Sequence, residues 1–337
     1  MVNLTTEYLG LTLKNPLVPS SSPLTGKLDD AKRLEDAGAA ALILPSLFEE
    51  ALIHEQEHMD RFLNQQDIGH FEAESFLPTS HHFASTLDQY LERIENFKQA
   101  LAIPVIGSLN GTTEEGWIDH AKDLEEAGVD ALELNLYGIN ADIQDSSDDI
   151  ERRYLKLVHE LKKTVDIPFI VKLSPQFTSL GHFVYHLQQA GAQGVSLFNR
   201  FYQPDIDLTS LNVTPHIQLS SSYESLLRIR WIALLRSQVS LTIAATGGFH
   251  HAEDAIKGLL AGADVIHLCS TLLEQGPEAL ARILGVITEW LQEKEYQSIQ
   301  QMKGSLSYQH AINPSAYERA NYLQVLDSYT PSAGVKV

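Results

Sequence analysis

The chain has 337 residues, of which 44% are hydrophobic, and a formal net charge of -20 at pH 7. This charge argues against nucleic acid and anionic membranes as partners, because both would repel the protein. The single cysteine excludes an internal disulfide and a cysteine-based metal cluster, and the lack of a leader-like N-terminus or a long apolar run leads us to expect a soluble, cytoplasmic protein.

The first residues predict a small hairpin and the first strand–helix unit. Residues 5–8 and 11–13 flank Gly10, and the hairpin they form is expected to close the bottom of a barrel. A strand beginning at Pro16 and a helix over about residues 27–37 follow.

A pattern then recurs in which a helix ends at a glycine and an apolar strand begins directly after it. Glycine suits this helix end because it adopts a left-handed backbone conformation without a clash at Cβ. The segments that show the pattern are EDAGAAALIL, EEAGVDALEL, QQAGAQGVSL and LLAGADVIHL.

A second set of strands, AIPVIGSL, DIPFIVKL and VSLTIAAT, alternates with these segments. Together they place strands near residues 16, 41, 104, 130, 168, 194, 241 and 264, each followed by a helical pattern. Eight such units in strict alternation predict an α/β fold, a (β/α)8 TIM barrel over residues 1–295, with a doubly wound open sheet as the alternative.

Three segments lie outside the eight strand–helix units of the predicted barrel. Residues 48–85 follow the second strand and residues 200–222 follow the sixth. Both insertions fall at the strand ends where a barrel carries its chemistry, so we expect them to act as lids. Residues 296–337 form a C-terminal extension with a helical segment, PSAYERANYLQVL, which we expect to pack on the barrel or on a partner subunit.

The last two strands end in turns suited to an anion. Gly247 and Gly248 follow the seventh strand, and Cys269 and Ser270 follow the eighth. Backbone N–H groups of two such turns can point at one anion, and these two loops of a barrel commonly hold a phosphate. His250 and His251, beside the glycine turn, are expected to contact the phosphate or to cap the next helix.

Polar residues at the other strand ends predict a ligand rich in hydrogen-bonding groups. Lys172 ends the fifth strand, where it would serve as a cofactor partner or an amine nucleophile, the alternative being a lysine that reaches solvent. A metal would need clustered histidines or carboxylates. His54 and His58, four residues apart, are more typical of a solvated helix face. No metal site is therefore predicted. The other polar residues are Ser108, Asn110, Asn135, Asn140, Asn199 and Arg200.

With these residues assembled, the chain resembles the dihydroorotate dehydrogenase family of FMN-dependent barrels, and its soluble branch most closely. The resemblance runs from NPLVPSSS through ELNL and VKLSP to ATGGF and LEQGP. It implies an oxidoreductase of pyrimidine biosynthesis that works as a homodimer, with an FMN ring over the barrel mouth and its phosphate in the last two loops. The FMN-binding residues that it implies are Ser20, Ser21, Asn110, Asn135, Lys172, Gly247, Gly248, Cys269 and Ser270, and we expect Asn135, Asn140 and Asn199 to contact the substrate.

The substrate side departs from the family pattern. The family carries a Cys or Ser base in the loop after the fourth strand, where this chain has Gly138, and the family's lysine at the end of the second strand falls at Pro45. A glycine cannot accept a proton, so the base is unassigned, with Tyr137, His81 and His82 as candidates. The electron acceptor is also unassigned, because no NAD fingerprint or cysteine cluster is present.

The resulting prediction is an FMN-dependent oxidoreductase that acts on a CH–CH bond of a small, anionic substrate by hydride transfer. Three alternatives stay open. They are a dihydroorotate dehydrogenase with a different base, a non-catalytic flavin-binding relative, and a phosphate-binding lyase or aldolase that uses Lys172 as a Schiff base.

Overall fold

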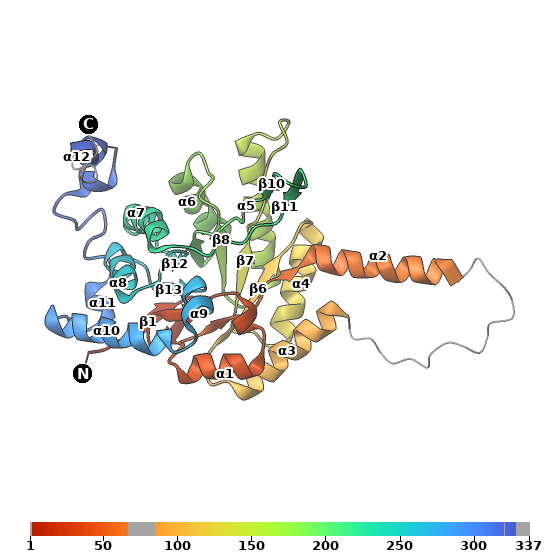
Figure 1. Ribbon diagram of the computed structural model, residues 1–337, viewed down its shortest axis with the longest axis horizontal. Helices are drawn as coiled ribbons and strands as arrows, with labels where there is room; N and C mark the ends of the chain where they lie inside the picture. The colour runs from red at the N-terminus through yellow and green to blue at the C-terminus, as the bar shows by residue number, and fades with distance from the viewer. Residues whose placement is uncertain (1, 67–84, 320, 328–337) are drawn as a thin grey trace.

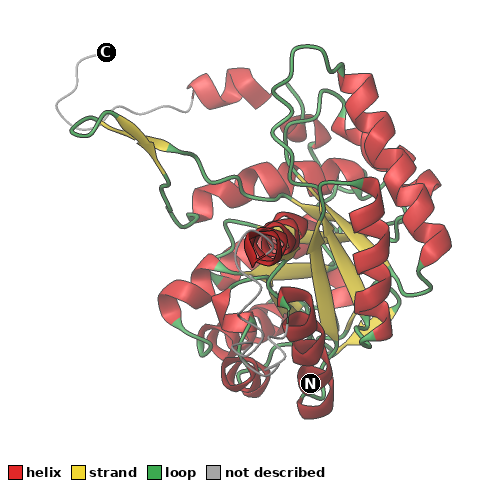
Figure 2. Ribbon diagram, turned by 90° about the vertical axis from the view of Figure 1, so that its right-hand side faces the viewer, coloured by secondary structure: helices red, strands yellow, loops and turns green. Residues whose placement is uncertain are grey.

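A computed structural model describes residues 2–66, 85–319 and 321–327. Eight parallel strands form a nearly closed barrel inside a layer of helices (Figures 1 and 2). The prediction of a (β/α)8 barrel is therefore confirmed, and all eight predicted strands are present. In chain order they are β3 Leu17–Pro19, β4 Leu42–Ile43, β6 Val105–Asn110, β7 Ala131–Asn135, β8 Phe169–Leu173, β9 Gly194–Leu197, β12 Thr242–Thr246 and β13 Val265–Leu268.

The strands pair in the order β3-β13-β12-β9-β8-β7-β6-β4. A hydrogen bond from the Ala40 N–H to the Leu17 carbonyl, 3.0 Å long, joins the two ends of this series. A short strand, β5 (Leu47–Phe48), adds to the carboxyl end of β6. All eight strands thus direct their carboxyl ends, and the loops that follow them, to one face of the barrel.

Two apolar layers hold the barrel together. The inner layer contains side chains such as Ile43, Ile106 and Ile170, all fully buried. The predicted hairpin, β1 (Thr6–Tyr8) and β2 (Leu11–Leu13), packs into the same cluster through Tyr8, Leu9 and Leu13, so it closes one end of the barrel as expected. The outer layer packs the strands against the surrounding helices.

The helices cover the outside of the barrel (Figure 2). Two of them end at glycines in positive-φ conformations, Gly191 (φ 109°) and Gly262 (φ 125°), as their sequence pattern predicts. The α-helices are α1 Leu28–Asp36, α2 Glu49–Gln66, α3 Thr86–Ala100, α4 Glu114–Glu126, α5 Ser147–Thr164, α6 Leu180–Ala190, α7 Ser225–Leu235, α8 Ala252–Ala261, α9 Ser270–Gln275, α10 Ala279–Glu293, α11 Ile299–Met302 and α12 Asn321–Asp327, and the 3-10 turns are η1 Pro23–Thr25, η2 Ser222–Glu224 and η3 Pro314–Tyr317.

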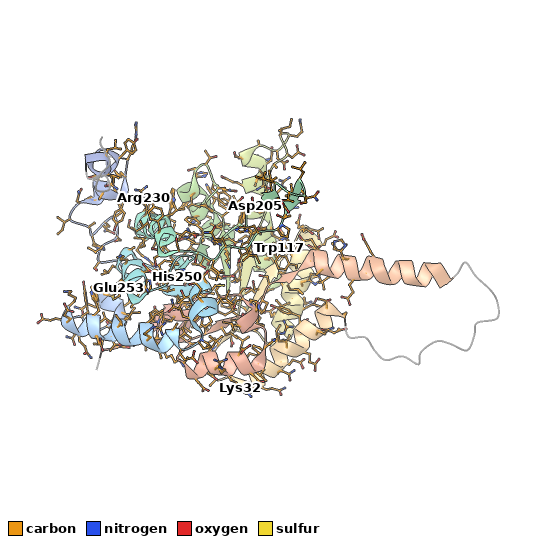
Figure 3. The ribbon with its side chains drawn as sticks, viewed as in Figure 1. Lys32, Trp117, Asp205, Arg230, His250 and Glu253 are labelled. Carbon is orange, nitrogen blue, oxygen red and sulfur yellow. The ribbon has the colours of Figure 1, made fainter. Side chains whose placement is uncertain are left out.

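Both predicted insertions leave the carboxyl face. The first begins with α2, which extends away from the barrel (Figure 1). The second forms a two-stranded hairpin, β10 (Asp205–Asp207) with β11 (Asn212–Thr214), marked by Asp205 in Figure 3. His70, His81 and His82 lie outside the described residues, and the role of either insertion as a lid stays a prediction.

Part of the C-terminal extension runs along the outside of the barrel. Gly304 and Leu306 donate backbone hydrogen bonds to the carbonyls of Leu259 and Leu260 on α8, and Tyr308 donates one to Ala233 on α7. Within the described part of the chain, no helix combines the length and the apolar character needed to cross a membrane.

Candidate active site

A cavity of about 530 Å³ opens at the carboxyl ends of the strands. Its size is in the range of cofactor and ligand sites. It lies where a barrel positions residues from several different strands around one ligand. The lining residues are Ser20, Ser21, Ser22, Pro23, Pro45, Ser46, Phe48, Asn135, Tyr137, Lys172, Asn199, Arg200, Tyr202, Ser220, Thr246, Gly247, Gly248, Phe249, His267, Cys269, Ser270 and Thr271.

One end of the cavity is a cradle of backbone turns. Gly247 and Gly248 adopt positive φ angles of 85° and 89°, which glycine tolerates and other residues rarely adopt. A Cβ on Gly248 would lie 2.3 Å from the backbone nitrogen of Ser225, in the first turn of α7. The close approach of these two backbones therefore requires glycine, and it brings N–H groups from two loops together.

Hydroxyl groups complete this cradle. The Ser220 hydroxyl accepts a hydrogen bond from the Gly248 N–H (3.3 Å) and donates one to the Ser270 hydroxyl (3.0 Å). His250, labelled in Figure 3, places its Nε2 2.9 Å from the Ser220 oxygen. The loops after β9, β12 and β13 thus converge on one polar point, and their donors suit an anion with several oxygens.

Two arginines share one glutamate beside the cradle. Arg200 Nε donates to Glu224 (3.2 Å), and an Arg228 nitrogen lies 3.8 Å from the same carboxylate oxygen. Arg228 is buried behind Gly247, where burial lowers the pKa of its guanidinium and Glu224 counteracts that effect. Arg200 and Arg228 thus place two cations next to the cradle, while the Asp254 carboxylate accepts hydrogen bonds from the backbone N–H groups of His250 and His251 beside it.

A buried ion pair forms part of the cavity floor. Lys172 Nζ donates to Glu133 Oε1 at 3.1 Å, and the Glu133 side chain is fully buried inside the barrel. Its other oxygen, Oε2, has no hydrogen-bond partner among the described residues. The Lys172 ammonium therefore lies between a buried carboxylate and the cavity.

His267 lies beside this pair as a neutral group. Its Nδ1 is 3.7 Å from Glu133 Oε2, and its Nε2 is 3.3 Å from the Tyr8 hydroxyl. Burial, followed by the charge of Lys172, lowers the pKa of His267 to about 3. Burial, followed by the charge of Glu133, raises the pKa of Tyr8 well above its ordinary value. At pH 7 both groups are uncharged, so Lys172 is the cation that compensates Glu133.

The mouth of the cavity is lined by aromatic rings. Phe48, Tyr137 and Tyr202 line it with 45%, 37% and 50% of their surface exposed. Tyr137 packs edge-on against Phe201, with ring centroids 4.3 Å apart. This side of the cavity therefore offers flat apolar faces.

Residues of the loop after β7 line two different cavities. Tyr137 faces the main cavity, whereas Gly138 and Asn140 line a separate cavity of about 280 Å³. A Cβ on Gly138 would lie 2.7 Å from the hydroxyl of Tyr154 on α5. That hydroxyl fills the space a side chain at position 138 would need.

The structure brings most of the predicted site residues together. Asn110 is buried at the end of β6 and is not among the lining residues, and Asn140 lines the second cavity instead of the first. Asn199 and Asn135 meet inside the main cavity, where the Asn199 amide donates to Asn135 Oδ1 at 2.7 Å. The predicted residues that line the main cavity are Ser20, Ser21, Asn135, Lys172, Asn199, Gly247, Gly248, Cys269 and Ser270.

Two buried residues of the floor were not predicted. Glu133 lies between the two leucines of LELN, and His267 is the polar residue of the otherwise apolar strand VIHL. A polar side chain in a strand of a closed barrel is a detectable signal, because burial requires a partner. The sequence pattern alone does not say that the partners are Lys172 and Tyr8.

Comparison with known proteins agrees with this geometry. A family model described as dihydroorotate dehydrogenase matches residues 82–291. The chain belongs to the dihydroorotate dehydrogenase family. Membership of this family supports an oxidoreductase that acts on a CH–CH bond.

Several curated members of the family are similar over most of their length. The catalytic subunit of dihydroorotate dehydrogenase B (NAD(+)) from Thermoplasma acidophilum is 24% identical over 317 residues, covering 90% of this chain and 99% of its own. Dihydroorotate dehydrogenase A (fumarate) from Lactobacillus delbrueckii subsp. bulgaricus is 26% identical over 290 residues, with 81% and 89% covered. The NAD-dependent dihydropyrimidine dehydrogenase subunit PreA from Escherichia coli is 22% identical over 323 residues, with 90% and 76% covered.

The cavity fits the cofactor that the sequence resemblance implies. The close approach of Gly248 to the Ser225 backbone leaves no room for a Cβ at position 248, and the cradle presents N–H and hydroxyl donors to an anion. A buried lysine and two asparagines lie deeper in the same cavity, as a flat heterocycle with polar edges requires. No group of three or more histidine, cysteine, aspartate or glutamate side chains in the described ranges is arranged to hold a metal ion.

Proposed function

We propose that the protein is an FMN-dependent oxidoreductase that transfers a hydride between a CH–CH bond of a small substrate and the flavin. The observation that carries this proposal is a single cavity with an anion cradle at one end and Lys172 with paired asparagines at the other. This layout matches a molecule with a phosphate on a chain and a planar, hydrogen-bonding ring. The bound flavin would supply the hydride-accepting chemistry, and the protein would supply binding and charge.

Different residues of the chain would bind the phosphate and the ring of the cofactor. Backbone N–H groups of Gly247, Gly248 and Ser270 would hold the phosphate, with the guanidinium groups of Arg200 and Arg228 beside them. Lys172 would favour negative charge on the ring edge that it faces. Asn135 and Asn199, fixed to each other by a hydrogen bond, would orient polar ring atoms. Tyr137 is the residue of the loop after β7 that faces this cavity, and we assign no catalytic base.

The absorption spectrum of the purified protein tests the cofactor. We expect a yellow protein, or one that turns yellow on incubation with FMN, and about one equivalent of FMN released on denaturation. A protein that stays colourless after incubation with excess FMN would overturn the proposal.

The ion pair at Lys172 argues against the aldolase alternative. A Schiff-base lysine must lose its proton to become a nucleophile, which usually requires an apolar pocket or a neighbouring cation. Here Nζ lies 3.1 Å from the buried Glu133 carboxylate, which is neither of these environments. Trapping with borohydride in the presence of aldehyde substrates is therefore expected to leave Lys172 unmodified.

We also propose that the protein forms a homodimer. Support comes from the hairpin of the second insertion, where Ile206, Leu208, Leu211 and Val213 are all more than 60% exposed. Light scattering is expected to give twice the chain mass of 37.5 kDa. Replacing Leu208 and Leu211 together by aspartate is expected to give monomers, and an unchanged mass would contradict a dimer through this hairpin. The electron acceptor is not proposed, because the relatives' names give both NAD(+) and fumarate.

A further inference from the structure

The cations that line the main cavity already have protein partners. The described lysine and arginine side chains of the lining are Lys172 and Arg200. Lys172 is paired with Glu133 at 3.1 Å. Arg200 donates to Glu224 and to the backbone carbonyls of Gln218 and Leu219, so each of its guanidinium nitrogens has an acceptor. Each of the two cations is therefore already paired with a carboxylate of the chain.

The loops around the mouth do not supply another cation. The segments that follow β7 and β9, residues 137–147 and 200–222, contain four aspartates, one arginine and no lysine. Their formal charge is therefore -3. The arginine is Arg200, and α2, whose charged residues are left out of this sum, extends away from the barrel (Figure 1). An anion that approaches this face meets a negative potential.

The walls of the cavity instead suit an uncharged, flat molecule. Phe48, Tyr137 and Tyr202 offer ring faces at the mouth. Asn135 and Asn199 are joined through one donor and one acceptor, which leaves the Asn135 amide nitrogen as a donor toward a ligand. The hydroxyls of Ser20, Ser21 and Ser46 add groups that can donate or accept. Carboxamides and hydroxyls pair well with the N–H and C=O groups of a ring amide.

We propose that the substrate is an uncharged planar ring amide, and not a carboxylate. This inference rests on the proposed function, and it replaces the anionic substrate expected from the sequence. A carboxylate in this cavity would lose its hydration without gaining a partner cation, and this loss would weaken its binding. A ring amide avoids that loss and gains contact with the aromatic walls.

A matched pair of ligands that differ by one carboxylate tests the inference. FMN-loaded protein is titrated with uracil and with orotate at about pH 8, above the ordinary histidine pKa of about 6.5, and binding is read from the perturbation of the flavin spectrum. Anaerobic bleaching by dihydrouracil and dihydroorotate gives the corresponding reaction. We expect uracil to bind at least about tenfold more tightly than orotate, and dihydrouracil to bleach the flavin faster. Tighter or equal binding of orotate, or no perturbation by either ligand, would overturn the inference.

A variant that adds a cation at the mouth gives the converse test. Phe48 lines the cavity and is 45% exposed, so Phe48→Lys is expected to fold. A new charge-assisted contact should tighten orotate binding about tenfold and leave uracil within about twofold. Phe48→Met is the uncharged control and should not gain orotate affinity. The inference fails if Phe48→Lys gains nothing for orotate, or if the methionine variant gains as much.

These experiments separate the two proposals. Protein that binds no flavin contradicts the proposed function. Protein that binds FMN and prefers orotate contradicts the uncharged substrate alone.

Discussion

Glu133 shows how one buried residue sets the charge that a cavity presents. Its carboxylate is paired with Lys172, and the neighbouring His267 is neutral at pH 7, because burial lowers its pKa to about 3. The ammonium of Lys172 therefore divides its charge between Glu133 and the ligand. The proposed flavin would therefore be next to a weaker cation than an unpaired lysine would provide.

Replacing Glu133 by glutamine is expected to raise the reduction potential of bound FMN. Glutamine keeps the shape of the side chain and removes the negative charge, so Lys172 favours the anionic reduced ring more strongly. We expect about a tenfold shift in the redox equilibrium, or about 30 mV for a two-electron couple, measured by equilibration with a reference dye. Tyr8→Phe is the control, since Tyr8 contacts His267 and does not line the cavity. An unchanged potential in Glu133→Gln would contradict this role.

Comparing alanine variants of Gly248 and Gly128 separates the effect of backbone strain from that of the cradle geometry. Both have positive φ angles, 89° and 95°, but a Cβ would contact the Ser225 backbone only at Gly248. We expect Gly248→Ala to weaken FMN binding by more than about tenfold, because the cradle must open to admit the methyl group. Gly128→Ala should cost about 1 kcal/mol of unfolding free energy and leave FMN binding unchanged. Equal FMN affinities in the two variants would show that the cradle is not the binding site.

The start of α2 is fixed to the start of α4 by one carboxylate. Glu49 is buried and accepts hydrogen bonds from the backbone N–H groups of Thr112 (2.5 Å) and Thr113 (2.9 Å), and from both hydroxyls. Thr113 is the N-cap of α4, so the anion also lies at the positive end of that helix. Burial raises the pKa of Glu49, but the hydrogen bonds from Thr113 and Thr112 outweigh it and the net pKa is lowered.

This contact makes part of the stability depend on pH. Because the folded pKa of Glu49 lies below its ordinary value of 4.5, the stabilisation is fully present above pH 4.5 and is lost as the pH falls through the folded pKa. We expect Glu49→Gln to reduce the unfolding free energy by about 1–3 kcal/mol at pH 7, and by less as the pH falls below 4.5. Urea unfolding at several pH values measures the difference, and a difference that stays constant with pH would contradict the role of the charge.

The barrel as a whole could be predicted because its repeats are local. Each unit carries its own helix, terminal glycine and apolar strand, so eight units are visible without knowledge of their packing. The course of the loop after β7 was not predictable in this way. Whether Asn140 faces the main cavity depends on contacts such as that between Gly138 and Tyr154, which join separate elements. Asn110 was likewise expected at the ligand and is instead buried beside the cavity at the end of β6.

The cradle, by contrast, could be predicted from the sequence, because its glycines are neighbours in the chain and their positive φ angles are a local property. The pairing of Lys172 with Glu133 depends on strand register. Asn135 of β7 pairs with Lys172 of β8. Glu133, two residues before Asn135, therefore lies on the same face of the sheet as Lys172. A strand's residues are visible in the sequence, but the side chain opposite each of them is set by the closed sheet.

The central claim, that this cavity binds FMN through its phosphate, is tested most directly by comparing FMN with riboflavin. The two ligands share the ring and differ in the phosphate that the cradle of Gly247, Gly248 and Ser270 would hold. Dissociation constants from flavin fluorescence titration of the flavin-free protein provide the comparison. We expect FMN to bind at least about a hundredfold more tightly, equivalent to about 2.7 kcal/mol. Equal affinity for FMN and riboflavin, or no binding of either, would contradict the account.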